Sequence, residues 1–210
     1  MIEMPCTQGE PDWFAARRGV ITATRAADLL RRTSRGWAAS RAKMVAKIAM
    51  ERIDSAPRDA VTSRTMARGH ELEPEAIGTY EFERGVSVRR VGLVLHDDFP
   101  QFGCSPDGLV GEDGGVEVKC PDAPDKMADY LLNGAHVAEY EGQVRHCLYI
   151  TGRKWWHVVA FDPRTPNGWN LAIGEVFAPE CWAEYEADLL EVDAEINAMV
   201  ARLHDVRGAA

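Results

Sequence analysis

The sequence lacks the features that would tie it to a membrane or to an oxidising compartment. In its 210 residues no apolar run approaches the roughly 18 residues of a bilayer-spanning helix, and the N-terminus lacks the basic-then-apolar order of a signal peptide. The cysteines are odd in number and include no CxxC pair: Cys6, Cys104, Cys120, Cys147 and Cys181. This pattern argues against a disulfide framework and against a zinc or iron–sulfur site. It predicts reduced, mostly buried thiols in a cytoplasmic protein that does not bind a membrane.

The chain also lacks a positive net charge. Its formal charge of −9 argues against indiscriminate binding to nucleic acid. The charges are distributed unevenly, because residues 17–52 carry ten Lys or Arg against two acids, whereas residues 175–195 carry eight acids and no base. Such asymmetry would let one face of the protein meet phosphates while another repels them. Two ordinary solvated helix faces would give the same counts.

The composition predicts one globular domain that spans residues 1–210. Hydrophobic residues make up 46% of the chain, which is enough for one substantial core and not for two. Sequence patterns predict helices over residues 22–30, 38–53, 75–84, 135–152 and 179–204, and strands within residues 86–97, 108–120 and 154–163. Pro74 either begins or kinks the third of these helices. This order predicts an α/β protein with a central mixed β-sheet flanked by helices.

The most informative stretch is SPDGLV, followed by a turn and then GGVEVKCP. In an extended strand residues two apart point to the same face, so Glu117 and Lys119 project together. The GEDGG turn folds Asp107 back towards them. Two carboxylates that converge beside an ammonium group repel one another in a protein core unless a cation joins them.

These residue types suit the hydrolysis of a phosphodiester. Hard divalent cations take oxygen ligands, which Asp107, Glu117 and the backbone carbonyl of Val118 could supply. Lys119 would hold and polarise the attacking water, or steady the charge on the scissile phosphate. The stretch matches the nuclease signature PD-(D/E)xK, from Pro106-Asp107 to Glu117-Val118-Lys119. An acidic hairpin with an exposed Glu-x-Lys would imitate this short signature.

The chain resembles the lambda exonuclease group, also called YqaJ-type viral recombinases, in the PD-(D/E)xK superfamily. The resemblance rests on DWFAARRGVITAT, GHELE, CSPDGLV, VEVKCP, EGQV and FDPR, which follow one another between residues 12 and 164. It implies a restriction-endonuclease-like core and a metal-dependent deoxyribonuclease that uses Mg²⁺, with Mn²⁺ able to substitute. It further implies 5'-to-3' exonuclease action on double-stranded DNA, which releases 5'-mononucleotides and leaves 3' single-stranded tails for phage-type recombination.

The resemblance also assigns roles to single residues. It places Glu73 at the metal site and Gln143 beside the active site. It gives a pocket for the terminal 5'-phosphate to Arg17, Thr24 and Ser105, and places Arg35 and Met66 against the DNA, the latter as a wedge between strands. An arginine can grip a phosphate bidentately, and the start of a helix at GVITAT favours an anion. The residues alone leave other interpretations open: a solvated glutamate, a core-edge amide, a helix cap at Thr22 and a core methionine.

The partners implied by the resemblance are double-stranded DNA ends, a single-strand annealing protein and two further copies of the chain in a homotrimer. Two other functions remain open. A structure- or sequence-specific endonuclease could use the same metal site, and a non-catalytic DNA-binding module could retain the same fold. The intact set of Asp107, Glu117 and Lys119 argues against the second. The sequence predicts no chemistry beyond Arg164 and leaves the role of residues 6–11 open.

Overall fold

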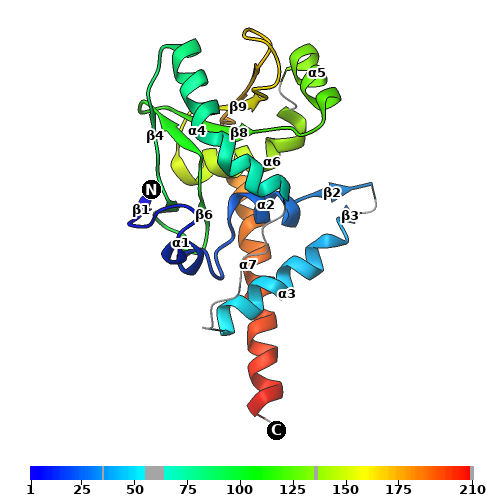
Figure 1. Cartoon of the computed structure of the whole chain (residues 1–210). Coiled ribbons are helices and arrows are strands. Elements are labelled where there is room, and N and C mark those ends of the chain that lie inside the picture. Colours follow the sequence, from blue (N-terminus) through cyan, green and yellow to red (C-terminus); the bar gives the residue numbers. More distant parts are fainter. Residues whose placement is uncertain (35, 55–63, 135–136, 209–210) are drawn as a thin grey trace.

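The fold is built around a five-stranded mixed sheet with the strand order β10-β9-β8-β7-β4 (Figure 1). The computed structural model describes residues 1–34, 36–54, 64–134 and 137–208, with only the backbone of residues 64–66. The strands of this sheet are β4 (Val88–Arg89), β7 (Gly108–Val110), β8 (Gly114–Lys119), β9 (Trp155–Phe161) and β10 (Leu171–Phe177). β8 and β9 run parallel and the other neighbours antiparallel, which confirms the expected mixed sheet.

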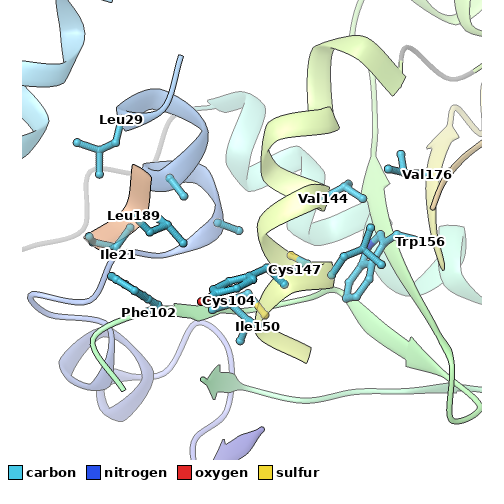
Figure 2. Close-up of a cluster of buried hydrophobic side chains, with 14 of the residues drawn as sticks. Ile21, Leu29, Phe102, Cys104, Val144, Cys147, Ile150, Trp156, Val176 and Leu189 are labelled. Atoms are coloured by element: carbon cyan, nitrogen blue, oxygen red, sulfur yellow. The ribbon is translucent and has the colours of Figure 1, made fainter. Parts of the chain in front are cut away.

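Helices cover both faces of this sheet. The described part of the chain forms α1 (Pro11–Ala16), α2 (Ala23–Leu29), α3 (Ser40–Ile53), α4 (Arg64–Arg84), α5 (Pro124–Asn133), α6 (Val137–Thr151) and α7 (Ala183–Gly208). On one face α6 packs against the fully buried Trp156, in the larger hydrophobic core (Figure 2). On the other face α4 places Tyr80 in a smaller core that includes Val118. Because side chains alternate along β8, Glu117 and Lys119 point to the α6 face.

The basic and the acidic parts of the chain pack against each other. α3 carries four of the ten basic residues of residues 17–52, and it crosses the long acidic helix α7 (Figure 1). Arg41 on α3 lies 2.8 Å from the Glu195 carboxylate, and Arg52 lies 2.6 Å from that of Asp193. These residues therefore do not form separate basic and acidic faces, which was one of the two interpretations that the charge counts left open. Sequence counts cannot show that opposite charges far apart in the chain neutralise each other.

The single strand expected within residues 86–97 is two strands in different sheets. β4 joins the central sheet, whereas the next strand joins a three-stranded sheet with the order β1-β5-β6. That sheet contains β1 (Ile2–Met4), β5 (Leu93–Leu95) and β6 (Gly103–Cys104). At Gly92, between the two strands, a Cβ atom would lie 2.0 Å from the carbonyl oxygen of Cys6. Glycine at this position therefore allows the N-terminal segment to pack against the chain where it passes from one sheet to the other.

Several helix boundaries differ from the expected ones. α4 begins at Arg64 and continues through Pro74, so the proline does not start this helix. Proline removes one backbone hydrogen bond, but the buried contacts of Tyr80 and its neighbours with the sheet stabilise α4 as a whole. α7 begins and ends about four residues later than expected. Thr22 occupies the N-cap position of α2, as expected, but its side chain makes no capping hydrogen bond.

Some elements have no counterpart in the sequence-based expectation. They are α1, α5, β10, the short strands β1 and β6, and a hairpin of β2 (Arg32–Thr33) and β3 (Gly36–Trp37). β10 lies beyond the region where chemistry was expected, and it forms one edge of the central sheet. No described helix combines the length and the apolar character that crossing a membrane requires.

The cysteines are free thiols, as expected, but most are not fully buried. Cys104 and Cys147 lie in the larger core, between α2, α6 and the sheet (Figure 2). Cys6 and Cys120 are half-buried, and Cys181 is exposed. The prediction of mostly buried thiols therefore holds for two of the five.

Candidate active site

A cavity of about 720 Å³ lies at the C-terminal end of β8, between α4 and α6. Its walls come from segments far apart in the sequence, which the central sheet brings to one place. They include every predicted site residue whose side chain is described: Arg17, Thr24, Glu73, Ser105, Asp107, Glu117, Val118, Lys119 and Gln143. The other two predicted residues cannot be placed, because Arg35 and the side chain of Met66 lie outside the described part of the chain.

The β7–β8 hairpin brings the two central carboxyl groups together. Asp107 directly precedes β7, and Gly108 pairs with Val116, so Asp107 stands opposite the end of β8. The backbone N–H of Val118 donates a hydrogen bond of 2.7 Å to Asp107 Oδ2. The pKa of Asp107 is raised well above its ordinary value. Burial is the largest cause, and the nearby carboxylates of Glu117 and Glu73 add to it. A cation at this site would relieve that repulsion.

Lys119 and Gln143 converge on one oxygen of Glu117. Lys119 Nζ donates to Glu117 Oε1 at 2.7 Å and to Gln143 Oε1 at 3.3 Å, while Gln143 Nε2 donates to Glu117 Oε1 at 2.6 Å. Burial lowers the pKa of Lys119, but the Glu117 and Asp107 carboxylates outweigh burial and leave the pKa above its ordinary value. The lysine is therefore a charged ammonium that is held beside the carboxylates.

The remaining oxygen atoms fit a hard divalent cation. Glu117 Oε2 is buried and has no hydrogen-bond partner among the described residues, so it is free to bind a cation. Within one strand residue the N–H and C=O point to the same side, so the carbonyl of Val118 faces the side of Asp107. These are oxygen donors of the kind that Mg²⁺ prefers. The described residues contain no cluster of three or more His, Cys, Asp or Glu arranged to hold a metal. The fit therefore rests on two carboxyl groups and a carbonyl.

Glu73 lines the cavity but is already paired. It lies on α4 with 15% of its side chain exposed, and its Oε1 accepts a hydrogen bond from Arg90. Its Oε2 lies 3.8 Å from His70 Nδ1. Arg90 also donates to the carbonyl oxygen of Asp107 at 3.1 Å. The structure thus places Glu73 close to the other carboxyl groups, with an arginine between it and the Asp107 backbone.

A second part of the cavity is suited to an anion. Ser105 Oγ accepts hydrogen bonds from Arg17 Nη1 at 2.7 Å and from Trp13 Nε1 at 2.9 Å, so its own proton remains available to donate. The Arg17 guanidinium lies over the Trp13 ring, 4.2 Å from its centroid. Burial lowers the pKa of Arg17 to about 10. The side-chain hydrogen-bond partners of Arg17 are hydroxyl groups, and among the described residues no carboxylate forms an ion pair with it. Thr24 lies exposed in the first turn of α2 and lines the same cavity.

Sequence reasoning gave no role to several residues that shape the site. Gln8 Nε2 donates to the carbonyl oxygens of Val91 (3.0 Å) and Pro106 (2.8 Å), which fixes the turn that carries Asp107. Gln8 lies in the segment of residues 6–11, whose role the sequence left open. Trp13 lies within a quoted motif but showed no sign of its contact with Ser105. A pattern in sequence cannot reveal such contacts, because the partners lie about 90 residues apart.

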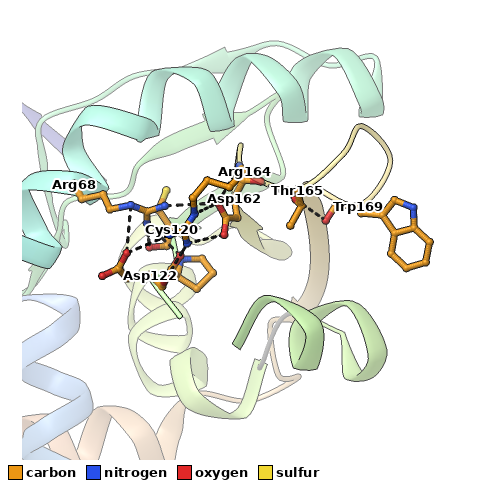
Figure 3. A network of polar contacts seen from close by, with 8 residues as sticks. Arg68, Cys120, Asp122, Asp162, Arg164, Thr165 and Trp169 are labelled. Atoms are coloured by element: carbon orange, nitrogen blue, oxygen red, sulfur yellow. Dashed lines mark hydrogen bonds and ion pairs between the residues drawn. The ribbon is translucent and has the colours of Figure 1, made fainter. Parts of the chain in front are cut away.

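The loop that follows Lys119 is held by two arginines around one buried aspartate (Figure 3). Asp162, 2% exposed, accepts hydrogen bonds of 2.8 Å from Arg164 Nε and Nη2 and lies 3.6 Å from Arg68 Nη2. Arg68 donates to the carbonyl oxygens of Cys120 (2.9 Å) and Pro121 (3.1 Å). Arg164 donates to the carbonyl oxygen of Asp122, in the same loop, at 2.8 Å. The arrangement fixes one wall of the cavity.

Comparisons with known proteins point to one family. The model of the YqaJ-like viral recombinase domain matches residues 12–154. Two crystal structures of an alkaline exonuclease, LHK-Exo from Laribacter hongkongensis, match with a TM-score of 0.85 and 33% identity. The first covers 95% of this chain and 99% of that one. The second, a complex with dAMP, covers 96% of this chain and 100% of that one.

A more distant structure shares the fold alone. A phage-related exonuclease from Haemophilus somnus 129PT matches with a TM-score of 0.69 and 12% identity, over 90% of this chain and 96% of that one. No curated protein sequence matches the chain. The nuclease fold expected from the sequence is thus confirmed by the match to the alkaline exonuclease.

Proposed function

The chain belongs to the YqaJ-like viral recombinase domain family, and from this premise we propose that it is a Mg²⁺-dependent 5'-to-3' exonuclease of double-stranded DNA. It would release 5'-mononucleotides and leave 3' single-stranded tails. The similarity to LHK-Exo, at 33% identity over nearly the whole of both chains, supports the assignment as a nuclease. The LHK-Exo complex with dAMP supports a mononucleotide as the product.

The observation that carries the proposal is the convergence of Asp107, Glu117 and Lys119 at the end of β8. The buried, unpaired Oε2 of Glu117, the carboxyl group of Asp107 and the carbonyl of Val118 would hold the ion. Bound Mg²⁺, or Mn²⁺ in its place, supplies Lewis-acid stabilisation of the charge that develops on the scissile phosphate.

The residues around the metal ligands would orient the reacting groups. Lys119 would position the attacking water and stabilise negative charge on the phosphate through its ammonium group. Gln143 holds Glu117 Oε1 and Lys119 Nζ in one hydrogen-bonded set, so their relative positions are fixed before substrate arrives. Glu73 would complete the site if its carboxylate turned from Arg90 towards the ion.

The anion-binding part of the cavity supports the 5'-to-3' polarity. A terminal phosphate would receive hydrogen bonds from Arg17 and Ser105, and from Thr24 at the rim. A half-buried guanidinium without a carboxylate partner gains from such an anion. Because this part and the carboxylates line one cavity, a strand held by its 5'-phosphate would place its first phosphodiester near Lys119.

The proposed assembly has further partners. The substrate is a double-stranded DNA end, and a single-strand annealing protein would receive the 3' tail. We further propose a homotrimer, since a closed ring would retain DNA despite the net charge of −9. The annealing protein and the homotrimer follow from the family resemblance, and both remain predictions.

The test is digestion of a linear duplex that is labelled separately at each strand end, with Mg²⁺, beside a supercoiled circle. We expect nucleotides to be lost from the 5'-phosphorylated ends while the circle stays intact. Asp107→Asn should be inactive, whereas Asp122→Asn should remain active, because Asp122 lines the same cavity but is 67% exposed. Nicking of the circle would indicate an endonuclease, and no cleavage with either Mg²⁺ or Mn²⁺ would indicate a binding module.

A further inference from the structure

We infer that Tyr140 is a positioning residue, whose aromatic ring confines the ammonium group of Lys119; the inference rests on the proposed function only for the role of that lysine. Lys119 Nζ lies over the Tyr140 ring, 4.6 Å from its centroid. A cation over the face of an aromatic ring is attracted by the electrons of the ring. The contact lies in the same cavity as the carboxylates.

Tyr140 reaches Lys119 from the helix that also supplies Gln143. The two residues are three apart on α6 and therefore lie on one face of the helix. This face of α6 is turned towards β8, and the side chain of Lys119 projects from β8 towards it. The ammonium is thus bounded by Glu117 Oε1, by Gln143 Oε1 and by the ring.

The ring is itself anchored at its far end. The hydroxyl groups of Tyr140 and Tyr130 lie 3.3 Å apart, and Tyr130 is 2% exposed on α5. α5 is further linked to α6 by the ion pair of Lys126 with Glu139, at 3.8 Å. A half-buried tyrosine fixed in this way cannot swing away freely, so its ring offers the lysine a stationary surface.

Confinement matters because lysine has a long, flexible side chain. Its four-carbon stem has many rotamers, and fixing it costs conformational entropy. Two hydrogen bonds leave the ammonium free to follow small movements of Glu117 and Gln143. A ring on a third side restricts that movement, and the third N–H of the ammonium remains available for water or phosphate.

The first experiment observes the contact directly in the protein without DNA. The chain has five lysines, Lys43, Lys47, Lys119, Lys126 and Lys154, so a sample labelled with ¹³C at lysine Cε gives a simple NMR spectrum. The Lys119→Arg variant assigns the signal. Protons above an aromatic ring are shifted upfield by its ring current. We expect this upfield shift for Lys119 in the wild type and in Tyr140→Phe, and its loss in Tyr140→Leu.

The second experiment measures hydrolysis of a 5'-phosphorylated linear duplex. Tyr140→Leu should lower kcat about two- to thirty-fold, the range that corresponds to a cation–π contact, and leave KM unchanged. Tyr140→Phe keeps the ring and should stay close to wild type. Tyr130→Phe removes the same hydroxyl contact from the other side and serves as its matched control.

Each outcome decides the inference. A Lys119 signal at the position of the other lysines in the wild type, an unchanged kcat in Tyr140→Leu, or a change in KM alone would overturn it. So would a Tyr140→Phe variant as slow as Tyr140→Leu, since the hydroxyl and not the ring would then matter. If the wild type cleaves no DNA, the proposed function fails, and the NMR comparison of Tyr140→Phe with Tyr140→Leu still decides whether the ring confines the lysine.

Discussion

The carboxyl group of Asp107 lies beside that of Glu117, held there by the backbone N–H of Val118, which donates to Asp107 Oδ2 at 2.7 Å. Burial and the neighbouring carboxylates raise the pKa of Asp107 above its ordinary value of 3.8. A carboxyl group whose pKa is raised on folding costs stability as the pH rises through the raised value. Burial of Asp107 beside Glu117 therefore lowers the stability of the folded protein as the pH rises above 3.8.

We predict that divalent cations stabilise the folded protein through this pair. At an ion concentration of about 100 times the dissociation constant, binding to the native state alone adds about 2.7 kcal/mol. Asp107→Asn removes the buried carboxyl group whose raised pKa costs stability, so without cations it should melt above the wild type at neutral pH. It should also lose most of the cation-dependent rise in Tm. Thermal unfolding with Mg²⁺, Ca²⁺ or EDTA measures both effects.

The control for this prediction is Asp122→Asn, which removes an exposed carboxylate from the same cavity. It should show the wild-type response to Mg²⁺ and Ca²⁺. A full cation-dependent rise in Tm for Asp107→Asn would contradict the assignment of the ion to Asp107 and Glu117.

Arg17 and Ser105 should determine how the enzyme distinguishes DNA ends. The wild type should degrade a 5'-phosphorylated strand in preference to a 5'-hydroxyl strand, because the phosphate receives charge-assisted hydrogen bonds. Such a bond contributes about 1.5–3 kcal/mol, or about ten- to a hundred-fold in affinity. Arg17→Gln should raise KM for the phosphorylated end by that factor and remove the preference. Ser105→Ala should do so more weakly, since it removes one neutral donor.

Steady-state kinetics on duplexes that differ only in the terminal phosphate test this prediction. Arg84→Gln is a suitable control, because Arg84 lines a different cavity beside Trp155. It should keep the wild-type preference. An Arg17→Gln variant that loses activity equally on both ends would show that Arg17 supports the fold or the chemistry and not the recognition of the end.

The centre of the site could be predicted from sequence because local rules determine it. The turn between β7 and β8 and the alternation of side chains along β8 bring Asp107, Glu117 and Lys119 together within thirteen residues. Periodicity also placed Gln143 on a helix that crosses the sheet. The short distances along the chain leave few other arrangements for these residues.

The rest depends on contacts that sequence does not encode locally. The bond of Trp13 to Ser105 and the bonds of Gln8 join segments about 90 residues apart. The ion pair of Arg41 with Glu195 spans 154 residues, and it cancels charges that suggested a separate basic face. β10 was not expected, since its weakly alternating sequence becomes a strand by pairing with β9.

Asp162 should be required for the position of the loop after Lys119 (Figure 3). Hydrogen bonds from Arg164 lower the pKa of Asp162, so the aspartate is charged at neutral pH and organises both arginines. Asp162→Asn leaves Arg68 and Arg164 without that charge. We expect a lower Tm and a lower kcat, because the carbonyl oxygens of residues 120–122 would lose their fixed donors.

The control is again an exposed carboxylate that contacts the same arginines. Asp122 lies 3.7 Å from Arg68 and 3.6 Å from Arg164, with 67% of its side chain exposed. Asp122→Asn should leave Tm and kcat close to wild type. Equal losses in the two variants would mean that the loop depends on the surface charge and not on the buried aspartate. Differential scanning fluorimetry and the duplex digestion assay give the two readouts.

His146 should make the fold sensitive to acid. The imidazole is fully buried on α6; Nε2 lies 3.2 Å from the carbonyl oxygen of Ile21, and Nδ1 lies 2.9 Å from the hydroxyl of Tyr185. A neutral ring that donates from Nε2 and accepts at Nδ1 satisfies both partners. Burial lowers the pKa of His146 to about 4, from an ordinary value of 6.5. The stability that this neutral ring contributes is present above pH 6.5 and is lost as the pH falls towards 4.

We therefore predict that the wild type loses about 3 kcal/mol of unfolding free energy through His146 between pH 7 and pH 4, at about 1.4 kcal/mol per pH unit. His146→Gln keeps one donor and one acceptor but does not titrate, so the difference in stability between it and the wild type should change by that amount over this range. His204→Gln, at the exposed end of α7, should follow the wild type throughout. Urea unfolding at a series of pH values measures the three curves. If the unfolding free energies of the wild type and His146→Gln change in parallel from pH 7 to pH 4, the acid sensitivity arises from the carboxylates. The buried imidazole of His146 would then not have the lowered pKa on which the prediction rests.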